Sequence, residues 1–198
     1  MVSFRGKDVA TSIFKGAVKG KVTIAGINVE GDDQADREVH GGVHKAVYAY
    51  AAEDYVWWAQ ELDREMHPGT FGDNITTSGI DVSGAVIGER WRVGTALLEV
   101  AQPRIPCFKL GIRMGTQTFP RRFSQARRPG AYLRIIDAGV AGAGDAIEKL
   151  DKPAHGVTVQ DVAHIYYAEP ERATELLQAP ELPDSWMEWA RHRLRQRA

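Results

Sequence analysis

Short β-favouring runs separated by glycine-containing turns constrain the fold of this 198-residue chain more than any other feature. Charged and apolar side chains alternate over residues 90–94, and a Gly94-Thr95 turn leads to residues 96–100, which predicts a β-hairpin. Further along, residues 138–144 predict a small-residue turn between two more strands. The runs that predict strands are 12–14, 22–24, 46–50, 90–94, 96–100, 131–136 and 146–150. Strands at this spacing favour a closed or nearly closed antiparallel barrel over an alternating βαβ sheet.

One helix is predicted within the β-rich part and three after it. Residues 51–62 place Ala51, Tyr55, Trp58, Ala59 and Leu62 on one apolar stripe, which is typical of a helix packed on a core. After a change of character at residues 151–156, Thr158 and Asp161 predict a capped helix start. Two shorter helices are expected at about 171–178 and 184–196, punctuated by prolines.

The chain is therefore expected to consist of a mainly β (α+β) unit, residues 1–152, and a small C-terminal three-helix module, residues 157–198. Three helices in forty residues also fit a helix-turn-helix, but only the last helix carries an arginine cluster, which a solvated face explains. We interpret the module as serving packing or interaction. Its predicted core is Val159, Val162, Ile165, Tyr166, Leu176, Leu177, Leu182, Trp186 and Trp189.

Composition excludes several classes of protein. Hydrophobic residues at 43% and charged residues at 26% are ordinary for a globular domain, and a net charge of −1 gives no field for nucleic acid or anionic membrane. A single cysteine excludes an intrachain disulfide and an all-cysteine metal site. The N-terminal residues contain no apolar leader core, and no run is long enough to span a bilayer, so a cytoplasmic location is expected.

The single cysteine, Cys107, follows a predicted strand. Pro103 and Pro106 each fix φ and lack an N–H, so they predict a stiff, extended loop that presents the thiol. The cations nearby in sequence, Arg104, Lys109 and Arg113, favour thiolate, which is the form that ligates a metal or attacks an electrophile. The alternative is a buried, inert cysteine, which is common in proteins.

Three further segments have both a binding and a purely structural interpretation. Residues 40–45 (HGGVHK) open onto a predicted strand, and their glycines let backbone N–H groups approach an anion, or they simply form a turn. Residues 69–76 suit a binding loop or a plain turn equally well. The arginines at 121, 122, 127 and 128 bracket a loop or short helix, and they either grip a phosphate or solvate an exposed face.

Taken together, these segments resemble the MOSC-domain family, in particular its bacterial stand-alone YiiM type. The resemblance covers nearly the whole chain in order, including the helical tail with LPDSWMEWA at 182–190. The matching segments are GDDQADREVHGGVHKAVYAY (31–50), PGTFGDNITTSG (68–79), IGERWRVGTALLEVAQPRIPCFKL (87–110), RPGAYLRI (128–135) and AGD (143–145).

The resemblance implies an antiparallel MOSC-type β-barrel with peripheral helices that binds the pyranopterin-dithiolene molybdenum cofactor. The family's motif cysteine falls on Cys107, which would be the protein ligand to molybdenum. In the family's G-E-N loop the glutamate is replaced by Asp73, and His44 stands where an acidic or small polar residue is usual. The cofactor-binding residues that follow are Gly41, Gly42, Lys45, Phe71, Gly72, Asp73, Asn74, Arg104, Lys109 and Arg128, with Cys107 and His40 as catalytic residues.

The activity that the resemblance implies is reduction of N-hydroxylated compounds, such as N-hydroxylaminopurine-type base analogues, to the amine or amidine and water. The departing water needs a proton, for which His40 or a bound water is the candidate acid. One cysteine cannot hold an iron–sulfur cluster, and no flavin or haem signature is visible, so electrons are expected from a separate flavin-type reductase. We expect no membrane or nucleic acid polymer as partner, and a homodimer is kept open.

Three alternatives remain at this point. Cys107 could carry a persulfide for sulfur transfer, or the chain could be a cofactor carrier without turnover. A divalent metal site at His40, His44 and a carboxylate is the third, although its remaining ligands cannot be identified.

Overall fold

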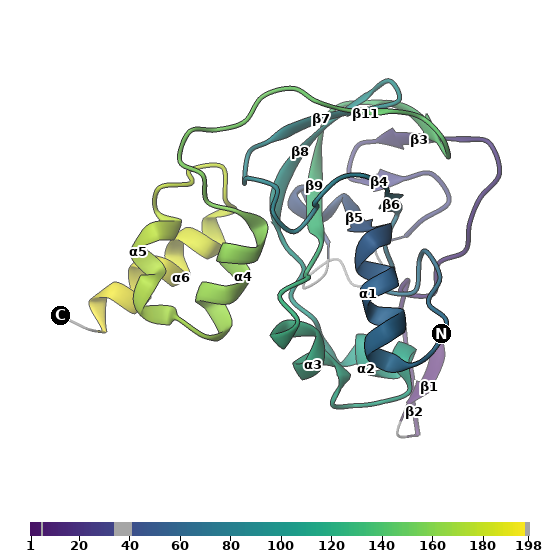
Figure 1. The fold of residues 1–198 in the computed structure, drawn as a ribbon, viewed down its shortest axis with the longest axis horizontal. Helices are drawn as coiled ribbons and strands as arrows, with labels where there is room; N and C mark the ends of the chain where they lie inside the picture. The colour runs from purple at the N-terminus through teal and green to yellow at the C-terminus, as the bar shows by residue number, and fades with distance from the viewer. Residues whose placement is uncertain (5, 34–40, 197–198) are drawn as a thin grey trace.

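The computed structural model describes residues 1–4, 6–33 and 41–196, and within them a curled sheet forms a half-barrel with helices on its outside (Figure 1). The sheet order is β11-β7-β8-β9-β5-β6. Its strands are β5 (Val47–Ala51), β6 (Ile75–Thr77), β7 (Arg90–Val93), β8 (Ala96–Pro103), β9 (Ala131–Asp137) and β11 (Ile147–Lys149). All pairs are antiparallel except β5 with β6. The predicted class, mainly β with peripheral helices and a C-terminal helical module, is confirmed.

Two smaller sheets and three helices complete the β-rich part. The sheets pair β10 (Gly139–Gly142) with β3 (Lys21–Ala25) and β4 (Asn28–Val29), and β1 (Val2–Phe4) with β2 (Lys7–Val9). The short 3₁₀ helix η1 (Val43–Lys45) precedes β5. The three helices are α1 (Ala52–Leu62), α2 (Phe108–Met114) and α3 (Phe119–Gln125). Helix α1 joins the parallel strands β5 and β6, because parallel neighbours need a crossover connection.

Strand β5 separates two hydrophobic clusters. Its side chains point alternately to opposite faces, as in any strand. Val47, Ala49 and Ala51 belong to the large cluster inside the curled sheet. Tyr48 and Tyr50 instead belong to an aromatic cluster beneath α1, α2 and α3. All five residues are buried, so the strand is shared by two cores. A pocket lies on its aromatic side.

The C-terminal helices pack on the sheet. They are α4 (Val159–Tyr167), the 3₁₀ turn η2 (Pro170–Arg172), α5 (Ala173–Leu176) and α6 (Asp184–Arg195), and Figure 1 shows them together at one side of the sheet. The predicted helix start is confirmed, because Thr158 and Asp161 form a reciprocal capping box. Most of the predicted core residues are buried in the same cluster as the sheet. The prediction that Tyr166 belongs to the core is wrong, because the residue is 37% exposed. No helix in the described part of the chain is long and apolar enough to cross a membrane.

Two sequence predictions in the sheet region are wrong. Residues 12–14 form no strand: Ile13 is buried in the aromatic cluster whereas Phe14 is exposed, and packing rather than a ladder fixes this segment. Residues 139–142 form strand β10 instead of a turn. Their small side chains permit close approach, because a Cβ on Gly139 would lie 2.4 Å from the backbone nitrogen of Ala96.

Residues 104–107 form the predicted loop, with Cys107 in extended geometry, but the helix directly after it was not predicted. Strand β8 continues through Pro103, which pairs with Ala131, and helix α2 begins directly after Cys107. Leu110 and Met114 bury one face of this short helix in the aromatic cluster. Tertiary burial therefore makes a helix that local sequence did not indicate.

Candidate functional site

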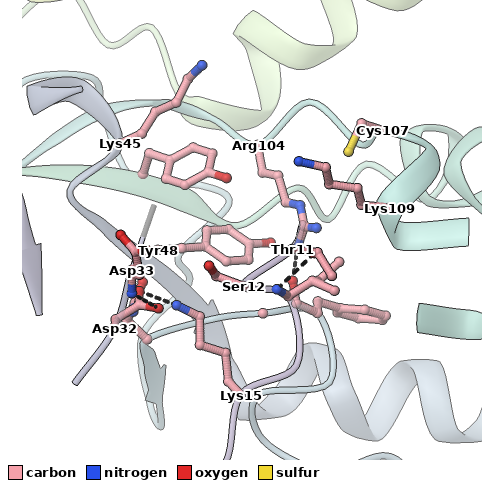
Figure 2. Close-up of a pocket in the computed structure, with 15 residues that line it drawn as sticks. Thr11, Ser12, Lys15, Asp32, Asp33, Lys45, Tyr48, Arg104, Cys107 and Lys109 are labelled. Atoms are coloured by element: carbon pink, nitrogen blue, oxygen red, sulfur yellow. Dashed lines mark hydrogen bonds and ion pairs between the residues drawn. The ribbon is translucent and has the colours of Figure 1, made fainter. Parts of the chain in front are cut away.

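A pocket lies where six segments distant in sequence meet beside β5 (Figure 2). Its cavity volume is about 100 Å³, and the pocket is open to solvent. It can enclose a small group, while a larger ligand would extend toward solvent. The lining residues are Thr11, Ser12, Ile13, Lys15, Asp32, Asp33, Lys45, Tyr48, Phe71, Gly72, Asn74, Arg104, Cys107, Lys109 and Tyr132.

Cys107 is the residue that gives this pocket a soft ligand or nucleophile. The residue is half-buried and its sulfur forms no disulfide. It occupies the N-cap position of α2 in extended geometry, and its carbonyl accepts a hydrogen bond from the Leu110 N–H at 3.0 Å. The thiol is therefore held between the end of β8 and the start of a helix, at the edge of the pocket. The interpretation of Cys107 as a deeply buried, inert residue does not fit this position.

Arg104 brings a positive charge into the protein interior. The residue is only 7% exposed, its guanidinium donates to the carbonyl of Phe71, and its Cζ lies 5.0 Å from the ring centroid of Tyr48. Burial raises the pKa of the Tyr48 and Tyr132 phenols, so both rings stay neutral at physiological pH. A buried cation held by a carbonyl and an aromatic face keeps its charge available to an anion in the pocket.

Lysines complete the positive lining. Lys45 and Lys109 line the pocket, and Figure 2 shows the Lys109 ammonium and the Cys107 sulfur on the same side of it. Lys15 forms an ion pair with Asp32, which also accepts a hydrogen bond from the Asn74 side-chain amide at 2.7 Å. Among the described residues, the lining therefore contains four cationic side chains and two carboxylates, those of Asp32 and Asp33. This balance favours an anionic ligand.

The 71–74 loop divides into residues that line the pocket and one that supports it. Phe71, Gly72 and Asn74 are lining residues. Two hydrogen bonds join Asn74 to the backbone of Tyr48 in β5. The Asn74 N–H donates to the Tyr48 carbonyl at 2.7 Å, and the Tyr48 N–H donates to the Asn74 side-chain oxygen at 2.9 Å. Asp73 is buried and accepts from the Tyr55 hydroxyl and the Thr76 hydroxyl as well as the Gly69 N–H. Its carboxylate therefore stabilises the conformation of the loop and does not line the pocket.

The predicted glycine-rich loop is described only in part. His40 lies outside the described residues. Gly41 and Gly42 do not line the pocket, whereas Lys45, which follows them in η1, does. Gly42 has φ 96°, a backbone conformation that glycine adopts readily. Among the residues that the structure describes, no group of three His, Cys, Asp or Glu side chains is arranged to hold a metal ion.

Arg128 is placed away from this pocket. Its guanidinium pairs with Asp54 at the start of α1 and lies 4.7 Å from the ring centroid of Trp57. Burial raises the pKa of the Asp54 carboxyl, and the hydrogen bond from Arg128 opposes that change. Arg128 therefore neutralises a buried carboxyl, and it borders a second, separate cavity together with Glu53 and Asp81.

Sequence reasoning missed several residues at the pocket. Lys15 and Asp32 are separated by 17 residues and meet only in the folded chain, and Tyr48 and Tyr132 lie on paired strands. Tyr167, at the end of α4, does not line the pocket but interacts electrostatically with Cys107. Its pKa is raised to about 12 by burial and by the neighbouring Tyr166 and Cys107, which places the helical module within electrostatic reach of the thiol. No local pattern in the sequence marks these residues.

Comparisons with known proteins identify the family and the fold. The model of the MOSC domain family matches residues 36–148. The uncharacterized protein YflK of Bacillus subtilis is 34% identical over 93% of this chain and 85% of its own length. A Gibberella moniliformis protein named reductase is 30% identical over 96% of this chain, which spans 35% of that relative. The crystal structure of YiiM from Geobacillus stearothermophilus superimposes with a TM-score of 0.80 at 30% identity, covering 92% of this chain and 88% of that one.

Proposed function

Because this chain belongs to the MOSC domain family and is of its stand-alone YiiM-like type, we propose that it is a molybdenum-cofactor-dependent reductase of N-hydroxylated compounds. The observation that carries the proposal is a half-buried thiol, that of Cys107, at a pocket lined by Lys15, Lys45, Arg104 and Lys109. The similarity to a protein named reductase supports an oxidoreductase.

The donor set of the pocket fits the pyranopterin molybdenum cofactor. A thiolate is a soft ligand suited to the metal, and the cofactor's phosphate needs cations of the kind that line this pocket. Cys107 would ligate the metal, and Lys45, Lys109 and Arg104 would hold the anionic part, with Gly72 and Asn74 forming the opposite wall. When bound, the cofactor would supply the two-electron redox chemistry that the protein's side chains lack.

The reaction proposed is R–NH–OH + 2e⁻ + 2H⁺ → R–NH₂ + H₂O. The N–O bond breaks and the oxygen leaves as water. The role of this chain is to bind and orient the substrate and to deliver a proton to the departing oxygen. His40, outside the described residues, is the proposed proton donor, since a histidine titrates near neutral pH. The two electrons would come from a separate flavin-type reductase.

The proposal is tested by anaerobic reduction of N-hydroxylaminopurine with reduced methyl viologen as electron donor. Wild-type protein loaded with cofactor should form the amine, and Cys107→Ala should lose activity by at least about a hundredfold, because a metal without its protein ligand is poorly oriented. Arg121→Ala, an exposed arginine outside the pocket, is the matched control and should keep activity.

Two other outcomes would replace the proposal. If the wild type contains cofactor but reduces no N-hydroxylated substrate, the chain is a cofactor carrier. If it lacks molybdenum and instead releases cyanide-labile sulfur that is absent from Cys107→Ala, the chain is a sulfur carrier acting through a persulfide.

A further inference from the structure

A buried chain of hydrogen bonds connects the helical module to the pocket. The indole N–H of Trp186 donates to the side-chain oxygen of Gln102 at 2.9 Å, and the Gln102 amide donates to the carbonyl of His44 at 3.1 Å. Trp186 and Gln102 are 7% and 6% exposed. An indole N–H only donates and a backbone carbonyl only accepts, so the Gln102 amide has a single satisfied orientation.

The three residues come from three different parts of the fold. Trp186 is on α6, Gln102 is near the end of β8, and His44 is in η1. Gln102 stands two residues before Arg104, and His44 is adjacent to Lys45; both of these cations line the pocket. The register of β8 against β9 shifts between Val100 and Gln102, which is a β-bulge of the kind that re-aims a side chain.

Helix η1 depends on contacts from outside itself. It has three residues, its N-cap Gly42 makes no side-chain capping bond, and none of its residues is fully buried. The Lys45 N–H donates to the carbonyl of Gly42 at 3.0 Å, which is one 3₁₀ turn. A single 3₁₀ turn has little intrinsic stability in water. The hydrogen bond from Gln102 therefore anchors the turn that carries Lys45.

We propose that Trp186 is a positioning residue of the pocket: through Gln102 it fixes η1, and with it Lys45, so that the helical module is required for anion binding although none of its residues lines the pocket. Asp184 at the start of α6 also acts electrostatically on His44, whereas Trp186 acts on this turn only through Gln102. The identity of the natural anion rests on the proposed function. The positioning of Lys45 by Trp186 and Gln102 does not depend on the proposed function.

The test uses Trp186→Phe, which keeps an aromatic ring in the core but removes the N–H, in full-length protein without cofactor. Hydrogen–deuterium exchange of the backbone amides in residues 42–46 should speed up about tenfold relative to the remaining chain, because the anchor of η1 loses its orientation. Binding of inorganic phosphate, measured by calorimetry, should weaken about tenfold. Trp189→Phe is the matched control on the same helix. Trp189 packs on Tyr166 and on the Trp186 ring but takes no part in the hydrogen bond between Trp186 and Gln102, so this variant should change neither quantity.

A second variant tests the same inference in case Trp186→Phe does not fold. Gln102→Met keeps the length of the side chain and removes both hydrogen bonds, and it should produce the same local exchange and the same loss of phosphate binding. Unchanged exchange in residues 42–46, or an equal increase along the whole chain, would overturn the inference. Absence of molybdenum chemistry in the wild type would remove the proposed function and leave these results standing.

Discussion

At the scale of single residues, Arg104 and Asp73 show how the pocket acquires its charge. Arg104 is almost completely buried, and the partners that the described residues give it are the Phe71 carbonyl and the faces of Tyr48 and Phe123. These partners are neutral, so none of these described groups cancels the positive charge of Arg104. The carboxylate of Asp73 is engaged behind the loop, by Tyr55 and other donors. The nearest loop carboxylate thus leaves the field of the pocket positive.

Gly72 gives a prediction at this scale. Its φ is +79°, and a Cβ there would lie 3.0 Å from Cγ1 of Ile13 and 3.3 Å from the Ile13 carbonyl oxygen. Gly79 has a nearly equal φ of +76° with no atom within 4 Å. Gly79→Ala should therefore cost about 1 kcal/mol of unfolding free energy through backbone strain alone. Gly72→Ala should cost about 1–3 kcal/mol more, because it also displaces Ile13 from the pocket wall.

Urea denaturation of the two glycine variants checks this prediction. Equal losses of stability in Gly72→Ala and Gly79→Ala would show that the contact with Ile13 does not constrain the loop.

At the scale of elements, the sequence predicted the pieces with a clear periodicity. The β7–β8 hairpin, β9, β11, α1 and the capped start of α4 were predicted because hydrophobic pattern and turn chemistry agree there. Strand β10 was missed because glycines usually indicate a turn, whereas here they allow close packing on the hairpin. Helix α2 was missed because two prolines before Cys107 favour extended chain, and burial of Leu110 and Met114 is visible only in the folded protein.

The turn η1 gives a prediction about pH. Burial lowers the pKa of His44, with Arg134 and Lys45 adding to the decrease and Asp184 and Glu99 opposing it. In the unfolded chain His44 takes up a proton near its ordinary pKa of 6.5, whereas in the folded chain it does so only at lower pH. His44 therefore contributes stability above pH 6.5, and this contribution is lost as the pH falls through the pKa of the folded chain. The unfolding free energy should thus fall from pH 7.5 to 5.5 more in the wild type than in His44→Gln.

Urea denaturation at several pH values measures this difference. His67→Gln is the control, since the His67 side chain is 68% exposed, and this variant should keep the wild-type pH dependence. A His44→Gln profile parallel to that of the wild type would contradict the assigned burial effect.

At the scale of the whole molecule, the pocket is a product of chain topology. Cys107, Arg104, Lys45 and the 71–74 loop could be proposed from the sequence because local motifs mark them. The ion pair of Lys15 with Asp32 could not, because it joins an N-terminal loop to a turn after β4. For Arg128 the sequence was misleading. Its neighbouring arginines resemble a phosphate-binding site, but in the fold Arg128 pairs with the buried carboxylate of Asp54. The roles predicted for His40, Gly41 and Gly42 stay predictions.

The most direct measurement is the molybdenum content of protein purified without oxygen from a host that makes the cofactor. The account predicts about one molybdenum per chain in the wild type and in the surface variant Arg121→Ala, and almost none in a folded Cys107→Ala protein, since the thiolate is the proposed ligand. Equal molybdenum in wild type and Cys107→Ala would contradict the ligand role of Cys107. No molybdenum in any of the three proteins would contradict the proposed reductase.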